Sequence, residues 1–377
     1  MKKLISIFLC IILSALVLVG CGEDPIGEYL PNYEKPVQKE KISLNLYIVA
    51  EICELDECKA DNFANCQHGS DKNALVTVQQ RISDYTTAKF NTTVNVKYYS
   101  KTEYESIIMD KALSNDLDKA DIILVTSEGM MDNLLDENVP ADLTDYFESK
   151  AYGTLNARIS SALLKKTLIP VEDEMRYYCV PNNHVVGAYQ YVLIDRSVAK
   201  AHSMDSKEKL NYYSTPETLA ELEATFGTDY TLGTEALEGS VNIVTANYGY
   251  EYDSTKYHCN VLSYPTVTRE YAFRSAFVIN QKTKDIDRAM EIVYAINTDE
   301  ELHNYLAYGI QGTNYSFNSD TDTVTLNTDL SSNSNYFVNP LYAGDIFTSY
   351  FCEQFGWNAL AKANGEVQNK EAIPAED

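Results

Sequence analysis

Between residues 42 and 126 the sequence alternates between the hydrophobic period of a strand and that of a helix, and this order restricts the fold more than any other feature. Apolar residues recur at every second position in 42–48 and 94–98, and residues 120–126 are apolar almost throughout. Helical spacing fills 75–85, and a second helix is expected to end near residue 113. Because crossover connections are right-handed, this order predicts three parallel strands in a wound α/β lobe.

In such a lobe the ligand crevice lies outside the carboxyl ends of the strands. Glu51 follows the first predicted strand, and Ser127 and Glu128 follow the third. A helix is expected at 130–135, so its free backbone N–H groups would point toward the same place. We therefore predict Glu51, Ser127 and Glu128 as ligand contacts, with helix capping as the alternative role of Ser127.

The first 21 residues predict export. Lys2 and Lys3 precede an apolar run from Leu4 to Val19, which is short for a membrane span and fits a secretory signal. The segment closes on Leu-Val-Gly-Cys, which resembles the lipobox of bacterial lipoproteins and implies lipid attachment at Cys21. The alternative is an ordinary signal peptide with an incidental Cys21. We expect a signal peptide at 1–20, a flexible tether at 21–41, and a protein anchored at the extracellular face of the cell membrane.

Charge excludes two classes of partner. The chain has 55 acidic and 30 basic residues, a formal net charge of −25, and loss of Lys2 and Lys3 makes it more negative. Such a balance repels nucleic acid and anionic lipid headgroups, so only the lipid anchor is expected to touch the membrane. Tyrosine occurs 29 times and tryptophan once. Rings with a polar edge suit a ligand crevice, and they equally suit ordinary strand surfaces.

The cysteines permit disulfides without selecting them. Six remain after Cys10 leaves with the signal and Cys21 takes lipid, and six cysteines allow 15 pairings. The six are Cys53, Cys58, Cys66, Cys179, Cys259 and Cys352. Their spacing lacks the tight ligand pairs of a zinc site, so we expect no metal.

Three segments carry a family resemblance. They are Asn-Val-Pro-Ala-Asp-Leu-Thr-Asp-Tyr at 138–146, the tract 175–196 with Tyr178, Pro181, Tyr189 and Asp195, and the tract 271–312. The last contains Asn-Thr-Asp-Glu-Glu-Leu at 297–302 followed by Tyr-Gly-Ile-Gln-Gly at 308–312. Together they resemble the extracellular solute-binding lipoproteins of ABC transporters, type 2. The resemblance is strong over 271–312 and weak over 205–260, where the chain is also shorter than family members.

The resemblance implies a two-lobed, type 2 periplasmic-binding-protein-like α/β fold that closes around a small polar solute and delivers it to an ABC permease. Lobe one would hold 42–182 plus 268–310, and lobe two would hold 183–267 plus 311–365, with 366–377 as a tail. The segments that cross between lobes would lie near 182–190, 262–270 and 310–316. The family favours carbohydrates, and peptides are the alternative. A monomer is expected.

Further ligand contacts follow from this arrangement. Asn182, Asn183 and Tyr189 would lie at the hinge. Tyr248 and Tyr250 follow a predicted strand at 241–245 and would close from lobe two. Tyr271 and Arg274 would begin a strand at 271–280 that returns to lobe one. Arg274 would clamp a carboxylate or hydroxyls through its forked donors, or would pair with an acidic neighbour.

The sequence contains no recognised catalytic motif. Ser206 to Lys209 satisfies an S-x-x-K pattern, but its S-D-N and K-T-G partner motifs are absent from the sequence. The sequence also lacks G-x-S-x-G, H-E-x-x-H and P-loop motifs. We therefore predict no catalytic residues, no cofactor and no enzyme. The rival functions are a surface adhesin or sensor without transport and an extracellular hydrolase.

Overall fold

The computed structural model describes residues 40–50, 70–215, 239–327 and 335–376 except positions 115 and 118, plus positions 217–218, 220–221, 224, 227 and 230–232. Residues 42–377 cluster as one compact unit. The predicted signal, lipid attachment at Cys21 and nearly all of the tether lie outside the described residues, as do Glu51, Cys53, Cys58 and Cys66. Among the described helices, none is long and apolar enough to cross a bilayer.

A five-stranded sheet organises lobe one, in the order β2-β1-β3-β12-β6. Strands β1 (Ile42–Ala50), β2 (Thr92–Ser100) and β3 (Ile122–Val125) are parallel, which confirms the predicted order. β12 (Ala276–Ile279) runs antiparallel to both β3 and β6 (Val180–Pro181). All residues of β3 and β12 are buried, as expected for strands that are covered on both faces.

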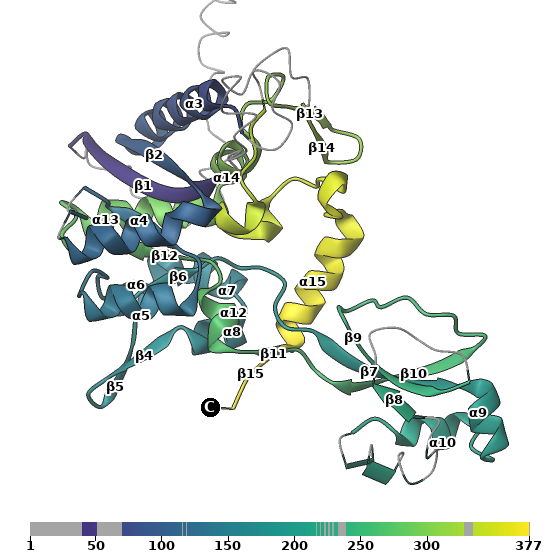
Figure 1. Ribbon diagram of the computed structural model, residues 1–377. Helices are drawn as coiled ribbons and strands as arrows, with labels where there is room; N and C mark the ends of the chain where they lie inside the picture. Colours follow the sequence, from purple (N-terminus) through teal and green to yellow (C-terminus); the bar gives the residue numbers. More distant parts are fainter. Residues whose placement is uncertain are drawn as a thin grey trace, which may run out of the picture. The chain divides into compact units, whose positions relative to one another are not determined.

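Helices cover both faces of this sheet (Figure 1). The crossovers α3 (Lys72–Phe90) and α4 (Lys101–Leu113) step in opposite directions across the sheet, so right-handed connections place them on opposite faces. α14 (Glu300–Tyr308) packs on α3, and α13 (Ile286–Thr298) packs on α14 and β12. On the other face, α5 (Glu128–Asp136) contacts α4 and α12 (Arg269–Phe273).

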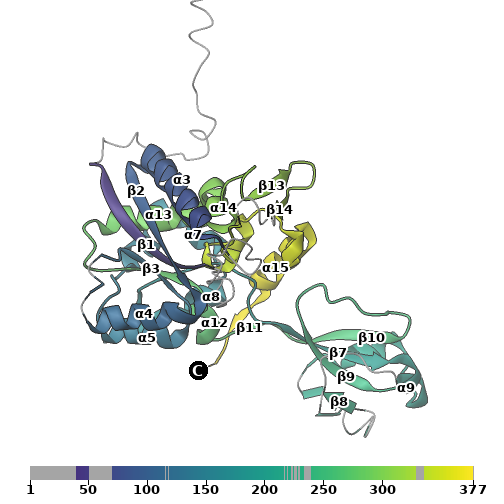
Figure 2. The same cartoon turned by 45° about the horizontal axis from the view of Figure 1, so that its top comes forward.

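A four-stranded sheet organises lobe two, in the order β10-β7-β9-β8 (Figure 2). β7 (Tyr189–Asp195) is antiparallel to β10 (Tyr257–Ser263) and β9 (Val241–Ala246), and β8 (Tyr230–Leu232) is parallel to β9. One face packs on the short helices α9 (Arg196–Ala201) and α10 (Lys207–Tyr212); its buried residues are Val192, Ile194, Val198, Ala199, Leu210, Tyr213 and Val241. The other face groups Tyr189, Tyr191, Leu193, Val244 and Tyr257.

The expected boundary of lobe two is wrong after residue 310. The chain stays with lobe one there, because Tyr315, Val324, Tyr336 and Val338 join the same apolar core as the five-stranded sheet. The predicted hairpin is present as β13 (Tyr315–Asn318) and β14 (Thr323–Leu326). Lobe two therefore connects to lobe one through 182–188 and 264–268, and the expected crossing at 310–316 is a turn within lobe one.

The expected tail at 366–377 is also wrong. Residues Ala359–Glu371 form the helix α15, and β15 (Ile373–Pro374) pairs with β11 (Thr266–Val267) beside the second crossing segment. Gln368 and Asn369 are buried. The sequence hides this helix because polar hydrogen bonds hold it in place, so it lacks an apolar stripe.

The remaining elements are short and belong to lobe one. They are β4 (Leu168–Val171), β5 (Glu174–Tyr177), α6 (Thr144–Glu148), η1 (Lys150–Tyr152), α7 (Gly153–Arg158), α8 (Ser161–Lys166), η4 (Pro340–Tyr342), η5 (Ile346–Thr348) and η6 (Glu353–Phe355).

Candidate ligand-binding site

The residues predicted after β3 are occupied by structural contacts. The Ser127 hydroxyl accepts a hydrogen bond from the Met130 backbone N–H at 3.1 Å, so Ser127 caps α5, as its alternative reading proposed. A Glu128 carboxylate oxygen accepts from Arg269 Nε at 2.9 Å. Arg269 also bonds Asp132 and lies over the Phe273 ring. This group ties α5 to α12 and engages one carboxylate oxygen of Glu128, whose side chain is still 37% exposed.

The predicted returning strand begins later than expected. Tyr271 lies in α12 and Arg274 caps its C-terminus, so both precede β12, which starts at Ala276. The run Tyr-Ala-Phe is apolar enough for either a strand or a helix, and Thr268 decides by capping the helix through the Tyr271 N–H. Arg274 is exposed, with its guanidinium carbon 5.9 Å from the Tyr271 ring centre.

Asn182 and Asn183 follow β6 at the carboxyl-end edge of the sheet, and both are buried. Asn182 Nδ2 donates to the Ser275 hydroxyl at 2.8 Å. Asn183 Nδ2 donates to the Arg158 carbonyl, and Asn183 Oδ1 accepts from Asn369 Nδ2 at 3.0 Å. The two asparagines therefore fix the first crossing segment against its neighbours.

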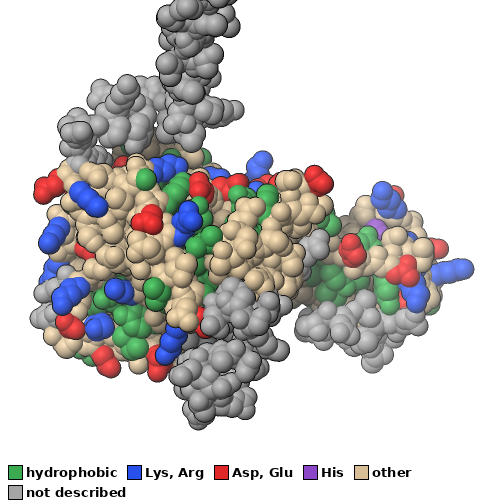
Figure 3. Space-filling model, turned by 90° about the horizontal axis from the view of Figure 1, so that it is seen from above, with side chains coloured by type: hydrophobic (Ala, Val, Ile, Leu, Met, Phe, Trp, Pro, Cys, Tyr) green, Lys and Arg blue, Asp and Glu red, His purple; other side chains and the backbone are tan. Residues whose placement is uncertain are grey.

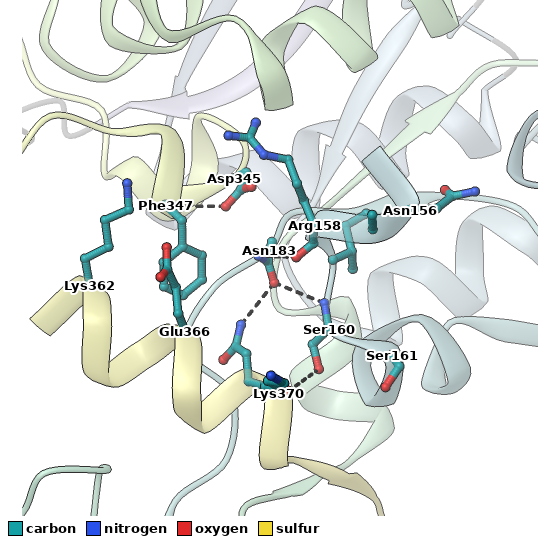
Figure 4. A pocket seen from close by; sticks show the side chains of 13 residues that line it. Asn156, Arg158, Ser160, Ser161, Asn183, Asp345, Phe347, Lys362, Glu366 and Lys370 are labelled. Atoms are coloured by element: carbon teal, nitrogen blue, oxygen red, sulfur yellow. Dashed lines mark hydrogen bonds between the residues drawn. The ribbon is translucent and has the colours of Figure 1, made fainter. Parts of the chain in front are cut away.

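An open pocket of about 550 Å³ adjoins Asn183 (Figure 4). We call it the strand-end pocket. Its lining comes from α7, α8, the turn around η5 and α15, and comprises Asn156, Ala157, Arg158, Ile159, Ser160, Ser161, Asn183, Asp345, Phe347, Lys362, Glu366, Asn369 and Lys370. The volume lies within the range of small-molecule sites in proteins.

Asp345 is the buried charge of this pocket, with 2% of its surface exposed. Its carboxylate accepts from the Phe347 backbone N–H at 2.9 Å. Burial raises the pKa of Asp345 to about 6, against the opposing effects of that hydrogen bond, of Arg158, of Asn183 and of Lys362. At neutral pH the group is largely an anion that can accept hydrogen bonds from a ligand.

Lobe two carries a cluster of rings that we call the tyrosine face: Tyr189, Tyr191, Tyr248, Tyr250 and Tyr264. Tyr191 stacks on both Tyr189 and Tyr250 with ring centres 5.6 Å apart. Tyr248 and Tyr264 lie 5.9 and 6.0 Å from the Tyr189 ring. Tyr189 is 1% exposed, whereas Tyr248 and Tyr264 are 38% and 52% exposed. The cluster is thus a buried aromatic base with an accessible outer layer.

The tyrosine face lies on the side of the sheet away from α9 and α10. Successive side chains along β7 point to opposite faces of the sheet. Tyr189 and Tyr191 therefore lie on one face, and Val192 and Ile194 lie on the other. Hydrophobic side chains, with tyrosine counted among them, gather on the part of lobe two seen at the right of Figure 3.

Helix α15 contacts the tyrosine face through polar groups. The Tyr189 hydroxyl donates to a Glu371 carboxylate oxygen at 2.5 Å. Burial first and the Glu371 carboxylate second raise the pKa of Tyr189, so this hydroxyl remains a donor. Gln368 accepts from the Tyr248 backbone N–H at 2.8 Å and donates to the Gly187 carbonyl at 3.0 Å. One helix therefore clamps both the first crossing segment and the edge of lobe two.

A glycine allows α15 its close approach. A Cβ added at Gly365 would lie 2.7 Å from Val185 Cγ2 and 3.0 Å from Phe347 Cε1. The helix thus seats against the crossing segment and the pocket wall at once.

The predicted contacts therefore fall into separate groups. Tyr189, Tyr248 and Tyr250 meet on the tyrosine face, whereas Ser127 and Glu128 bond within lobe one. Sequence reasoning missed Tyr191 and Tyr264 and the residues of α15. Tyr191 had a usable signal, because it lies two positions from Tyr189 on the same strand face.

Two expectations concern cysteines and metals. Cys179 and Cys259 are free thiols in the structure. Within the described ranges, His, Cys, Asp and Glu side chains form no group that could hold a metal ion.

Comparison with known proteins gives the fold. No protein-family model and no curated protein matches the sequence. Crystal structures of the N-glycan transport solute binding protein NgtS from Streptococcus pneumoniae match 89% of this chain. The structure without a named ligand gives a TM-score of 0.54 at 15% identity and 84% coverage of that chain. The complexes with Man1GlcNAc and Man5GlcNAc give 0.52 and 0.53 at 14% identity, covering 84% and 83%. The predicted two-lobed α/β fold, which NgtS shares, is confirmed.

Proposed function

We propose that this chain, which has the fold of a two-lobed solute-binding protein, captures a carbohydrate on the tyrosine face and passes it to an ABC permease. The observation that carries the proposal is the tyrosine face itself. It presents accessible rings on the side of a sheet that α9 and α10 do not cover, in a fold built to bind solutes.

The chemistry of the tyrosine face suits a sugar. The apolar faces of a pyranose ring stack on aromatic rings, and its hydroxyl edge needs mixed donors and acceptors. Tyr248 and Tyr264 offer the rings, and the exposed Glu371 carboxylate lies beside the Tyr189 hydroxyl at the edge of the cluster. The complexes of NgtS with Man1GlcNAc and Man5GlcNAc support an oligosaccharide over a peptide.

Binding would act through hinge closure about the crossing segments 182–188 and 264–268. A ligand that contacts both lobes in the closed state shifts an existing equilibrium toward that state. Asn369 and Gln368 bond the first crossing segment, so they would resist or guide its bending. A permease would recognise the closed form. In this proposal the sugar is bound and released unchanged.

Isothermal titration tests the proposal. The protein is titrated with Man5GlcNAc, Man1GlcNAc, maltose and a set of short peptides. We expect saturable binding of an oligosaccharide that weakens at least tenfold in Y248A and Y264A, because each loses a stacking ring. Y212A removes a ring that is as exposed as Tyr264 from α10, the helix on the other face of the sheet, and its affinity should stay within about twofold of the parent protein's. Binding of peptides alone, or of no compound, would refute the carbohydrate assignment.

Anchoring through Cys21 is a separate part of the proposal, resting on the lipobox-like Leu-Val-Gly-Cys. The protein expressed with its own signal should partition into the detergent phase of Triton X-114, and C21S should move to the aqueous phase. Equal partition of the two forms would remove the anchor and leave sugar binding untouched.

A further inference from the structure

The strand-end pocket and the tyrosine face lie against opposite sides of α15. Lys362, Glu366, Asn369 and Lys370 line the pocket, whereas Gln368 and Glu371 bond the region of the tyrosine face. At 100° per residue the first set falls within about 100° of the helix circumference, and the second set is centred on the other side. A ligand in the pocket would therefore occupy a different place from a sugar on the tyrosine face.

Several polar groups of this pocket have no protein partner. Among the described residues, the side chains of Lys362, Glu366 and Lys370 make no hydrogen bond or ion pair, although Lys362 attracts Asp345 through its charge. Asn156 donates through Nδ2 to the Phe147 carbonyl, and its side chain points away from the pocket (Figure 4). The charged side chains of α15 are therefore the groups left for a ligand.

The charge of the pocket opposes that of the chain. Three basic side chains line it, Arg158, Lys362 and Lys370, against the two carboxylates Asp345 and Glu366. The whole sequence has almost twice as many acidic as basic residues. A basic majority in such a chain favours a ligand that carries an anion.

The acceptors lie on both walls. Asp345 precedes η5, and Glu366 lies on α15 (Figure 4). A ligand must therefore carry hydrogen-bond donors spread over its body, as the hydroxyls of a sugar are. An amino acid gathers its donors on one ammonium group and would leave one wall unpaired.

We propose that the strand-end pocket is a second binding site, and that it takes an acidic monosaccharide, a polyol with one carboxylate. The carboxylate lies at Lys362, and the hydroxyls donate to Asp345 and Glu366. Phe347 supplies the apolar wall.

Titration calorimetry on the whole protein tests this site. The probes are D-glucuronate, D-galacturonate and N-acetylneuraminate, with D-glucose and D-galactose as uncharged matches, acetate as a bare anion and L-glutamate as an amino acid. At least one acidic sugar should bind at least tenfold more tightly than its uncharged match. K362Q should weaken it at least tenfold and K362R less than threefold. K284Q, which removes an exposed lysine of lobe one outside the pocket lining, should change nothing.

Four results would overturn the proposal. They are no binding by any acidic sugar at millimolar concentration, equal binding of charged and uncharged sugars, equal binding of acetate or L-glutamate, and full affinity in K362Q. Circular dichroism of K362Q at native intensity ensures that lost binding is not lost folding. Because these probes and variants differ from those used for the tyrosine face, either site can fail without the other.

Discussion

The two sheets of this protein bury their residues in different ways. The five-stranded sheet is covered on both faces, and β3 and β12 are apolar at every position. The four-stranded sheet has α9 and α10 on one face and tyrosines on the other. The first arrangement gives a continuous core, whereas the second leaves rings within reach of solvent. We therefore assign most of the stability to the five-stranded sheet and ligand contact to the four-stranded sheet.

The largest expected effect tests where stability lies. F277A truncates a fully buried ring in β12 and should lower the free energy of unfolding by about 3–5 kcal/mol. L193A truncates a buried side chain beneath the tyrosine face and should cost less, because the thinner lobe can collapse around the cavity. Urea unfolding followed by circular dichroism measures both. A larger loss in L193A would reverse the contrast between the two sheets.

The next largest effect is a loss of stability at acidic pH, caused by two buried histidines. Burial lowers the pKa of His184 and of His303 to about 4. Below the unfolded value of about 6.5 the unfolded chain binds protons that the folded histidines refuse, so stability falls as pH drops from about 6.5 to about 4. From pH 7 to pH 5 each histidine should cost about 2 kcal/mol. Asp345, with its pKa raised to about 6, offsets about 1 kcal/mol, because it takes up a proton in the folded state first.

Urea titrations at pH 7 and pH 5 measure this loss. H303Q should remove about half of the histidine contribution to the difference, since it removes one of the two buried histidines. An equal pH difference in H303Q and the parent protein would contradict the assignment of the loss to buried histidines.

A smaller effect concerns the contact between α15 and lobe two. E371Q weakens the charge-assisted bond from the Tyr189 hydroxyl, and Glu371 is exposed, so we expect a cost of only about 1 kcal/mol. Amides of β7 should exchange with deuterium several times faster. E376Q removes an exposed carboxylate beyond β15 and should leave β7 unchanged. Unaltered exchange in E371Q would mean that the bond does not restrain lobe two.

The smallest expected stability change falls on the exposed layer of the tyrosine face. Y248A should alter the free energy of unfolding by about 0.5 kcal/mol or less, since its ring is partly solvent-accessible. Its sugar affinity should fall far more. Thermal melting without ligand measures the first effect. A large drop in melting temperature would show that Tyr248 supports the fold, and would contradict the assignment of the tyrosine face to ligand contact alone.

The sequence predicts lobe one well because its elements carry strong periodicity. The alternation at 42–48 and the helical spacing at 75–85 arise because one face of each element is buried more deeply than the other, and the structure confirms β1, α3, β2, α4 and β3. The alternation of Tyr189 with Tyr191 likewise reports the aromatic side of β7. Local patterns are informative where apolar burial fixes the element.

The rest depends on contacts between residues far apart in the chain. Helix α15 is held by Gln368 and Asn369, whose partners Val186 and His184 lie more than 180 positions earlier. The return of 311–352 to lobe one depends on packing of Tyr315 and Val338 into a core built by earlier strands. No local pattern encodes these contacts, so the expected tail and lobe boundary were wrong. The strand-end pocket, which α15 completes, was invisible for the same reason.

Hydrogen–deuterium exchange with and without a saturating oligosaccharide tests most directly whether the tyrosine face holds the ligand. We expect slower exchange at residues 246–252 and 262–267, which border the exposed rings, and little change in β3 and β12. Protection confined to lobe one, with the segments around Tyr248 and Tyr264 exchanging as in the free protein, would contradict this prediction.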